Sequence, residues 1–181
     1  MKKKILWITR TAVVLALLLT LQVLTKPFGQ FVTGSCVNLV LALTALLAGL
    51  PSALVLALVS PVLAYLLGIA PQVLTVPAIM AGNCAYVLLL ALISDRKSVN
   101  VLRQVFAVAG AAAAKFVVLY GIVGGLICGV LAERLLDAGV LKAPMLQLLP
   151  AMFSWPQLVT ALIGGSLAMG LYPLLRRAIC R

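Results

Sequence analysis

Residues 101–131 read VLRQVFAVAGAAAAKFVVLYGIVGGLICGVL, an apolar run whose only charges are Arg103 near its start and Lys115 at its centre. A helix crosses the hydrocarbon core of a bilayer in about 20 residues. The run therefore predicts a membrane-spanning helix. It also places a lysine near the middle of the membrane, and this lysine is the strongest indication of a binding site in the sequence.

Similar apolar runs fill most of the rest of the chain. Hydrophobic residues make up 65% of the 181 residues, charged residues make up 9%, and the mean hydropathy is +1.25. A soluble domain of this length could not cover so much apolar surface, so lipid must be the solvent for most of it. We predict an all-α membrane protein with one integral domain, residues 1–181, and six transmembrane helices in one bundle. The predicted spans are roughly 5–25, 33–50, 52–70, 76–94, 101–131 and 152–174.

The longest connection, residues 132–150, separates the last two spans. Its pattern predicts a short surface helix from Ala132 to Ala138, ended by Gly139. Small residues also recur at four-residue spacing, as at Gly121 and Gly125 in span five. In span six the same spacing separates Ala161 from Gly165, and Gly164 from Ala168. Because small residues let helix backbones approach closely in lipid, we expect both groups to pack inside the bundle.

Basic residues gather on one side of this six-span layout. Ten of the 14 lysines and arginines lie near the N terminus, in the 95–103 turn or near the C terminus, whereas the alternate loops hold Lys26, Arg134 and Lys142. Basic residues close to span ends are retained in the cytoplasm. We therefore expect both termini to be cytoplasmic. The net charge of +11 then reports topology and attraction to anionic lipid, and we expect no nucleic-acid partner.

Composition also argues against several classes of site. The chain has no histidine, its four cysteines lack metal-like spacing, and its three acidic residues lie outside the predicted spans. A membrane enzyme would need acids, histidines or a nucleophile motif within the spans. We therefore expect no enzyme activity, no cofactor and no metal site.

Hydrogen-bonding side chains gather in the outer halves of the predicted spans. Tracing each span from its cytoplasmic or outer end, at about 1.5 Å per residue, brings groups from five or six helices to matching depth. This arrangement predicts a pocket that opens outward, with Gln22 near the outer end of span one. The candidate substrate-binding residues are Lys115, Asn83, Gln157, Trp155, Asn38, Tyr120, Tyr86 and Gln30. Trp155 is equally explained as an anchor at the membrane interface, and an amide can simply bond a neighbouring helix.

Lys115 differs from the other candidates because it is charged. A lysine at the membrane centre costs about 2.5–3.5 kcal/mol even on insertion scales, and no span contains an acidic partner. Snorkelling to a surface is the alternative, but a residue this close to the middle of its span has far to reach. We expect Lys115 to face a wet cavity and to bind an anionic group of a ligand.

The chain resembles the substrate-binding S component of an energy-coupling factor (ECF) transporter. The resemblance rests on a small six-span protein with both ends inside, the Ala12-x-x-x-Ala16 pair, and Gly82-Asn83. Ser154-Trp155-Pro156-Gln157 and Ile163-Gly164-Gly165 in span six also look like this family. It implies that Ala12 and Ala16 dock against a transmembrane coupling subunit, that two partner ATPases supply the energy, and that the protein lies in the plasma membrane of a prokaryote.

The resemblance implies a small, vitamin-like ligand, and the candidate site residues favour one that is neutral or carries a carboxylate. Thiamine-like cations are disfavoured because no acidic residue would neutralise them. The chain has no Gly-x-x-x-x-Gly-Lys-Ser/Thr phosphate loop of its own, so ATP hydrolysis would belong to the partners. The alternative is a self-sufficient secondary transporter of a small anionic solute. That class usually has more ionisable residues in its spans and inverted repeats, neither of which is evident here.

Overall fold

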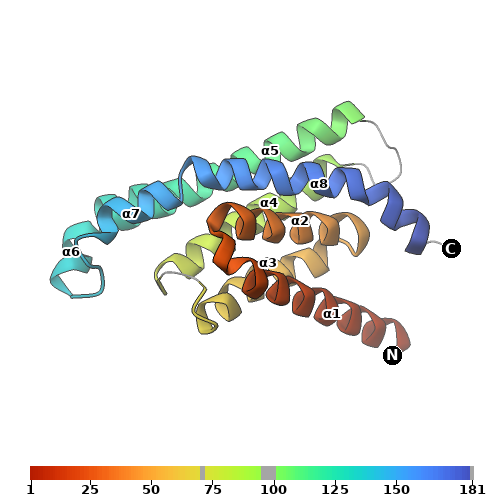
Figure 1. Ribbon diagram of the computed structural model, residues 1–181, viewed down its shortest axis with the longest axis horizontal. Coiled ribbons are helices and arrows are strands. Elements are labelled where there is room, and N and C mark those ends of the chain that lie inside the picture. Colours follow the sequence, from red (N-terminus) through yellow and green to blue (C-terminus); the bar gives the residue numbers. More distant parts are fainter. Residues whose placement is uncertain (70–71, 95–100, 180–181) are drawn as a thin grey trace.

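The computed structural model describes residues 1–69, 72–94 and 101–179, which are mostly helical and include no strand (Figure 1). The predicted all-helical class is thus confirmed. Two short segments interrupt the α-helices: η1, a single 3-10 turn, and η2, a π-helical stretch. The elements in chain order are α1 (Lys2–Thr25), η1 (Lys26–Phe28), α2 (Gln30–Leu47), α3 (Leu50–Leu66), α4 (Thr75–Ile93), α5 (Val101–Tyr120), η2 (Gly121–Val130), α6 (Ala132–Asp137), α7 (Met145–Met152) and α8 (Trp155–Ile179).

Five helical segments among the described residues are long and apolar enough to cross a membrane. They are Lys2–Phe28, Gln30–Leu47, Thr75–Ile93, Val101–Val130 and Met145–Ala178. The helix α3 is also apolar, but at 17 residues it is shorter than these five. Such a set of helices is what a multi-pass membrane protein contains. Most of the predicted charged turn, residues 95–100, lies outside the described residues.

The predicted third span, 52–70, ends too late in the sequence. The helix α3 stops at Leu66 because Gly68 adopts a left-handed conformation with φ +66°. The backbone amide of Gly68 donates to the carbonyl of Tyr65 (2.9 Å), and that of Ile69 donates to the carbonyl of Ala64 (2.8 Å). This is the Schellman pattern, in which a left-handed residue closes the last helical turn.

The first part of the connection after span five follows the prediction. Its second part forms a helix that was not predicted, α7 (Met145–Met152), and the end of span five also differs. The predicted short helix is present as α6, and Gly139, with φ +68°, follows its last turn. The predicted continuous α-helix over 101–131 changes at Gly121 into the π-helical η2. Four of the ten residues of η2 are glycine, and glycine tolerates departures from α-helical geometry at low steric cost.

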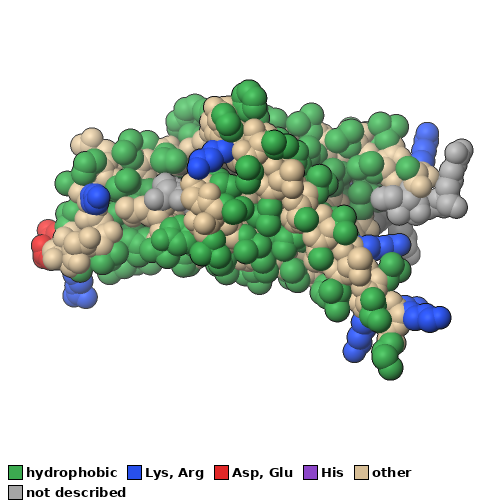
Figure 2. Space-filling view, turned by 60° about the horizontal axis from the view of Figure 1, so that its bottom comes forward, with side chains coloured by type: hydrophobic (Ala, Val, Ile, Leu, Met, Phe, Trp, Pro, Cys, Tyr) green, Lys and Arg blue, Asp and Glu red, His purple; other side chains and the backbone are tan. Residues whose placement is uncertain are grey.

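The helices pack along one long axis, with α5 and α8 side by side and both chain ends at the same end of the molecule (Figure 1). The main hydrophobic core draws buried residues from α1, α2, α3, α4, α5 and α8, including Leu18, Leu41, Leu56 and Leu90. A second core at the other end joins α4, α5, η2 and α7 around Leu119. On the face drawn in Figure 2, most Lys and Arg side chains lie toward the two ends of the long axis, and the middle is largely hydrophobic.

Close helix approach depends on the glycines of α8, which pack as predicted. A Cβ atom added to Gly164 would lie 2.6 Å from the backbone oxygen of Ser35 and 2.7 Å from the Cβ of Asn38, both on α2. The expectation for span five is wrong. Cβ atoms added to Gly121 or Gly125 would meet no atom within 4 Å, because this side of η2 faces away from the described residues.

We predict that Gly164→Ala destabilises the protein more than Gly170→Ala does. At Gly164 the new methyl group must push α8 away from the α2 backbone, and overpacking of this kind typically costs about 1–3 kcal/mol. At Gly170, on the same helix, a Cβ would meet nothing within 4 Å. Thermal unfolding of both variants in detergent measures the difference. Equal melting temperatures would show that the α2–α8 contact tolerates separation.

Candidate functional site

A cavity of about 280 Å³ lies among the helices near the C-terminal end of α1. Its volume is just below the range of about 300–1,000 Å³ that is typical of small-molecule sites. Its wall combines polar and apolar side chains from eight elements or the loops beside them. The lining residues are Gln22, Lys26, Gly29, Gln30, Thr33, Gly34, Val37, Ser60, Pro61, Ala64, Ile69, Ile79, Asn83, Lys115, Met152, Phe153 and Gln157.

The buried charge of the wall is the ammonium of Lys115, at the middle of the segment 101–130. The side chain is only 3% exposed. Its Nζ donates to the Oδ1 atoms of Asn38 (2.6 Å) and Asn83 (2.8 Å), and it lies 5.7 Å from the centre of the Tyr86 ring. Among the described residues, no carboxylate pairs with this ammonium; Glu133 and Asp137 both lie on α6. The positive charge is therefore balanced only by neutral dipoles and by an aromatic face.

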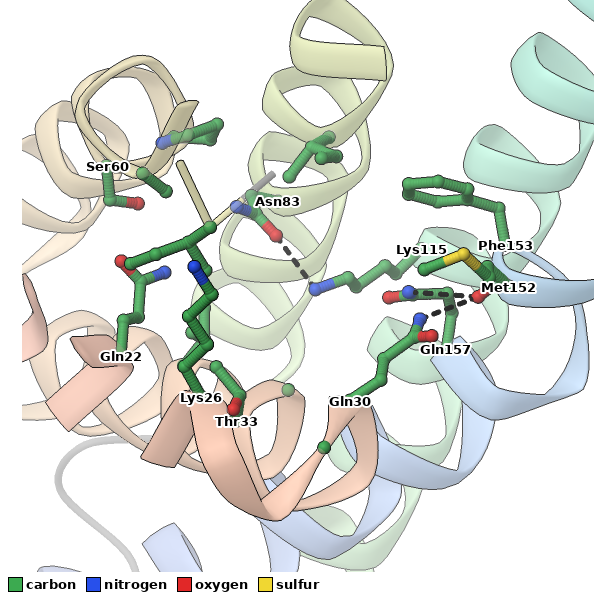
Figure 3. Close-up of a pocket in the computed structure, with 17 residues that line it drawn as sticks. Gln22, Lys26, Gln30, Thr33, Ser60, Asn83, Lys115, Met152, Phe153 and Gln157 are labelled. Carbon is green, nitrogen blue, oxygen red and sulfur yellow. Dashed lines mark hydrogen bonds between the residues drawn. The ribbon is translucent and has the colours of Figure 1, made fainter. Parts of the chain in front are cut away.

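The hydrogen bonds of Lys115 fix the orientation of both asparagines. A lysine ammonium has three donors and no acceptor, so each amide must turn its oxygen toward it. The Nδ2 of Asn38 then donates to the Oγ1 of Thr160 (3.4 Å), away from the cavity. The Nδ2 of Asn83 has no partner among the described residues and lies on the cavity side (Figure 3). With two bonds made, the third donor of Lys115 remains for another acceptor.

Two glutamines on the other side of Lys115 tie three helices together. The Nε2 atoms of Gln30 (2.7 Å) and Gln157 (3.3 Å) both donate to the backbone oxygen of Met152, at the end of α7 (Figure 3). These bonds join the first turns of α2 and α8 to α7. They give this side of the cavity a fixed polar edge beside the apolar side chains of Met152 and Phe153.

Four of the predicted site residues line the cavity, and two more support it. Lys115, Asn83, Gln30 and Gln157 are in the wall. Asn38 and Tyr86 lie behind it, fully or almost fully buried (1% and 0% exposed). The Tyr86 hydroxyl donates to the backbone oxygen of Ala161 (3.2 Å), so this tyrosine offers Lys115 its ring rather than its hydroxyl.

The structure does not bring Trp155 and Tyr120 to the cavity. Trp155 is 60% exposed, with its ring 5.5 Å from that of Phe31, and Tyr120 is 47% exposed, stacked on Phe116 at 5.8 Å. On a helix of 3.6 residues per turn, Tyr120 lies about 140° around the axis from Lys115, so it points outward. Both positions suit aromatic residues at a membrane interface.

Several wall residues were not among the sequence candidates. Gln22 (6% exposed), Thr33 and Ser60 (1% exposed) each place in the wall a buried oxygen without a partner among the described residues. Depth along span one did indicate Gln22, whereas nothing in the sequence separated Thr33 or Ser60 from structural hydroxyls. Lys26 also lines the cavity, and its Nζ donates to the backbone oxygen of Gly68 (2.8 Å).

The predicted docking pair lies on the outside of α1. Ala12 and Ala16 are both exposed, whereas Leu18 of the same helix is fully buried. The neighbouring Thr11 is turned inward, and its Oγ1 is 2.9 Å from the Oγ of Ser52 on α3. The alanine pair therefore presents a surface of small side chains that no described part of the chain covers.

Comparison with protein-family models, with curated proteins and with solved structures finds no match to this chain. The cavity and the sequence are therefore the features of this chain that bear on its function.

We predict that Asn38→Ala destabilises the ligand-free protein more than Asn83→Ala does. Both variants remove one acceptor from Lys115, and a hydrogen bond to a charged group contributes about 1.5–3 kcal/mol. At position 83, water in the cavity can replace the lost oxygen, and the variant also removes an unpaired donor. Melting curves of both variants without ligand measure the difference. A larger loss for Asn83→Ala would mean that Asn83 is chiefly structural.

Proposed function

We propose that this chain is the substrate-binding subunit, or S component, of an ECF-type importer. The observation that carries this proposal is Lys115, a buried ammonium without a carboxylate partner among the described residues and with one remaining donor in the wall of a cavity. A packing lysine would not require a cavity beside it. A carboxylate, or the carbonyl oxygen of a neutral ligand, can supply the missing acceptor, so a neutral or carboxylate-bearing vitamin or precursor is the preferred substrate class.

The proposed topology has six spans, with both termini in the cytoplasm of a prokaryotic cell and the cavity opening to the outside. The 17 residues of α3 lie at the lower limit of about 17–25 that suffices for a membrane helix. The excess of basic residues near the termini supports the orientation. In this orientation, the connection that carries Lys142 is extracellular.

Labelling of single cysteines tests this orientation. After replacement of the native cysteines, Lys142→Cys in intact cells should react with a membrane-impermeant maleimide, whereas Lys4→Cys should react only after the membrane is permeabilised. The cytoplasmic retention of basic residues is the physical reason. The reverse labelling pattern would mean that the cavity opens toward the cytoplasm, and it would contradict a role in uptake.

The exposed face of α1 supports a coupling role for this helix. In its most apolar window, α1 has the smallest buried share, 17%, against 33–39% for the other four spanning segments. Ala12 and Ala16 lie on its exposed side, where a helix of a coupling subunit could approach closely. Two ATPase subunits would power the complex, since the chain itself has no phosphate-binding loop.

Two variants separate substrate binding from coupling. Lys115→Gln removes a charge-assisted contact worth about 1.5–3 kcal/mol, so it should weaken binding by roughly ten- to a hundredfold or more. Ala12→Trp should leave binding unchanged but block close helix approach, so co-purification with the coupling subunit and ATP-dependent uptake should be lost. Titration calorimetry and uptake into proteoliposomes measure the two effects, and Val13→Trp on exposed α1 surface is the matched control.

The same proteoliposomes distinguish the alternative function. Concentrative uptake by this chain alone, driven by an ion gradient, would replace the proposal with a secondary transporter of a small anionic solute. Full ATP-dependent uptake by Ala12→Trp would show that the alanine pair is not part of the docking surface.

A further inference from the structure

Building on the proposed binding function, we infer that the cavity recognises two different groups of one ligand. The first is a carboxylate at Lys115. The second is a neutral group that both donates and accepts hydrogen bonds, such as a carboxamide. It binds at what we call the amide subsite, formed by Gln22, Ser60 and the Nδ2 of Asn83. The ligand class is therefore a small monocarboxylate with a distal amide-like group.

The amide subsite consists of buried polar atoms that the protein itself leaves without partners. The Oε1 of Gln22, the Oγ of Ser60 and the Nδ2 of Asn83 have no hydrogen-bond partner among the described residues. These side chains are 6%, 1% and 1% exposed, and all three line the cavity. Buried polar groups are nearly always paired in folded proteins, because an unpaired group loses its hydration without compensation. With the Oγ1 of Thr33, the wall holds four such atoms, and they indicate a ligand that pairs them.

The chemistry of these atoms defines the group that fits them. The Oε1 of Gln22 can only accept a hydrogen bond, the Nδ2 of Asn83 can only donate, and the Oγ of Ser60 can do both. A carboxamide offers the complementary set, with N–H donors and a carbonyl acceptor. A carboxylate has no proton to donate to the Oε1 of Gln22, so it fits only if this amide turns to present its Nε2 instead.

Asn83 separates the two ends of the cavity. Its Oδ1 is held by Lys115 at 2.8 Å, so its Nδ2 must point to the other side of the side chain. Figure 3 shows this geometry: the amide nitrogen of Asn83 faces the side where Gln22 and Ser60 lie, and its oxygen faces Lys115. One side chain therefore contributes to both subsites and sets the order of the ligand groups between them.

Charge and apolar lining support the same assignment. Lys26 is the other cation in the wall, but its Nζ already donates to the backbone oxygen of Gly68 at 2.8 Å, and its side chain is exposed. This ammonium keeps two donors, but solvent screens its charge, so it attracts a second anionic group less strongly than the buried Lys115 attracts the first. Val37, Ile79 and Pro61 supply apolar wall. This lining suits a hydrocarbon spacer between the two polar groups.

A matched series of synthetic ligands tests the inference. The probes are ω-carbamoyl carboxylates with two to five methylenes (succinamate to pimelamate). Each is compared with the diamide, the diacid and the simple alkanoate of the same length, by titration calorimetry on the purified protein. We expect at least one ω-carbamoyl carboxylate to bind at least tenfold more tightly than all three analogues of its length. Lys115→Gln should reduce its affinity to that of the diamide.

Variants of the amide subsite provide the second readout. Gln22→Met and Ser60→Ala should retain alkanoate affinity but reduce the preference for the ω-carbamoyl compound to less than about threefold, since each removes a partner of the distal group. Ser60→Ala should also raise the melting temperature without ligand. The matched control is Ser35→Ala, whose hydroxyl lies outside the cavity wall and already donates to the backbone oxygen of Phe31 (2.7 Å).

Each contrary result has a distinct meaning. An alkanoate that binds as tightly as its ω-carbamoyl analogue, or a diacid that binds more tightly, would overturn the amide subsite and leave the proposed function intact. A diamide that binds as tightly as the ω-carbamoyl compound, without dependence on Lys115, would overturn the carboxylate end and remove Lys115 as the support for the proposed function, which ATP-dependent uptake would then decide. Failure of every length to bind would overturn the two-group assignment, while ATP-dependent uptake would still decide the proposed function.

Discussion

The ammonium of Lys115 is the constraint on which the centre of this molecule depends. A charge inside a membrane protein must be solvated by the protein, and here two amide oxygens and the face of Tyr86 provide that solvation. Because lysine only donates, it dictates which way Asn38 and Asn83 turn. One amide nitrogen is thereby directed into the helix packing and the other toward the cavity. The orientation of both amides thus follows from a single charged side chain.

That arrangement requires close packing of α2 against α8. Gly164 allows the backbone of α8 to approach Asn38 within a distance that no larger residue would permit. The approach also brings Thr160 within reach of the Asn38 amide. Packing through small residues and interhelical hydrogen bonding act together in lipid, where burial of apolar surface gives no preference for helix contact over lipid contact. The tight contact and the polar cavity are two consequences of the same helix pair.

The cavity wall has more hydrogen-bonding capacity than the protein uses. Lys115 keeps one donor, and Gln22, Ser60 and Asn83 keep unpaired atoms beside it. In contrast, the amide nitrogens of Gln30 and Gln157 already donate to the backbone oxygen of Met152 at the end of α7. The wall is therefore rigid on one side and receptive on the other. A preorganised site of this kind lowers the entropic cost of fixing a small ligand.

The sequence by itself determined the helical class, and it predicted a membrane environment and the relative depth of each polar group. These follow from hydropathy and from the fixed rise per residue along a helix. It therefore identified Lys115, Asn83, Gln30 and Gln157 as residues that could meet. Only the tertiary structure decided which way each helix turns about its own axis, because that rotation is set by packing against neighbours. The same rotation turned Trp155 and Tyr120 outward and brought Gln22 and Ser60 into the wall. Depth along the helices could not distinguish the residues that face the cavity from those that face away from it.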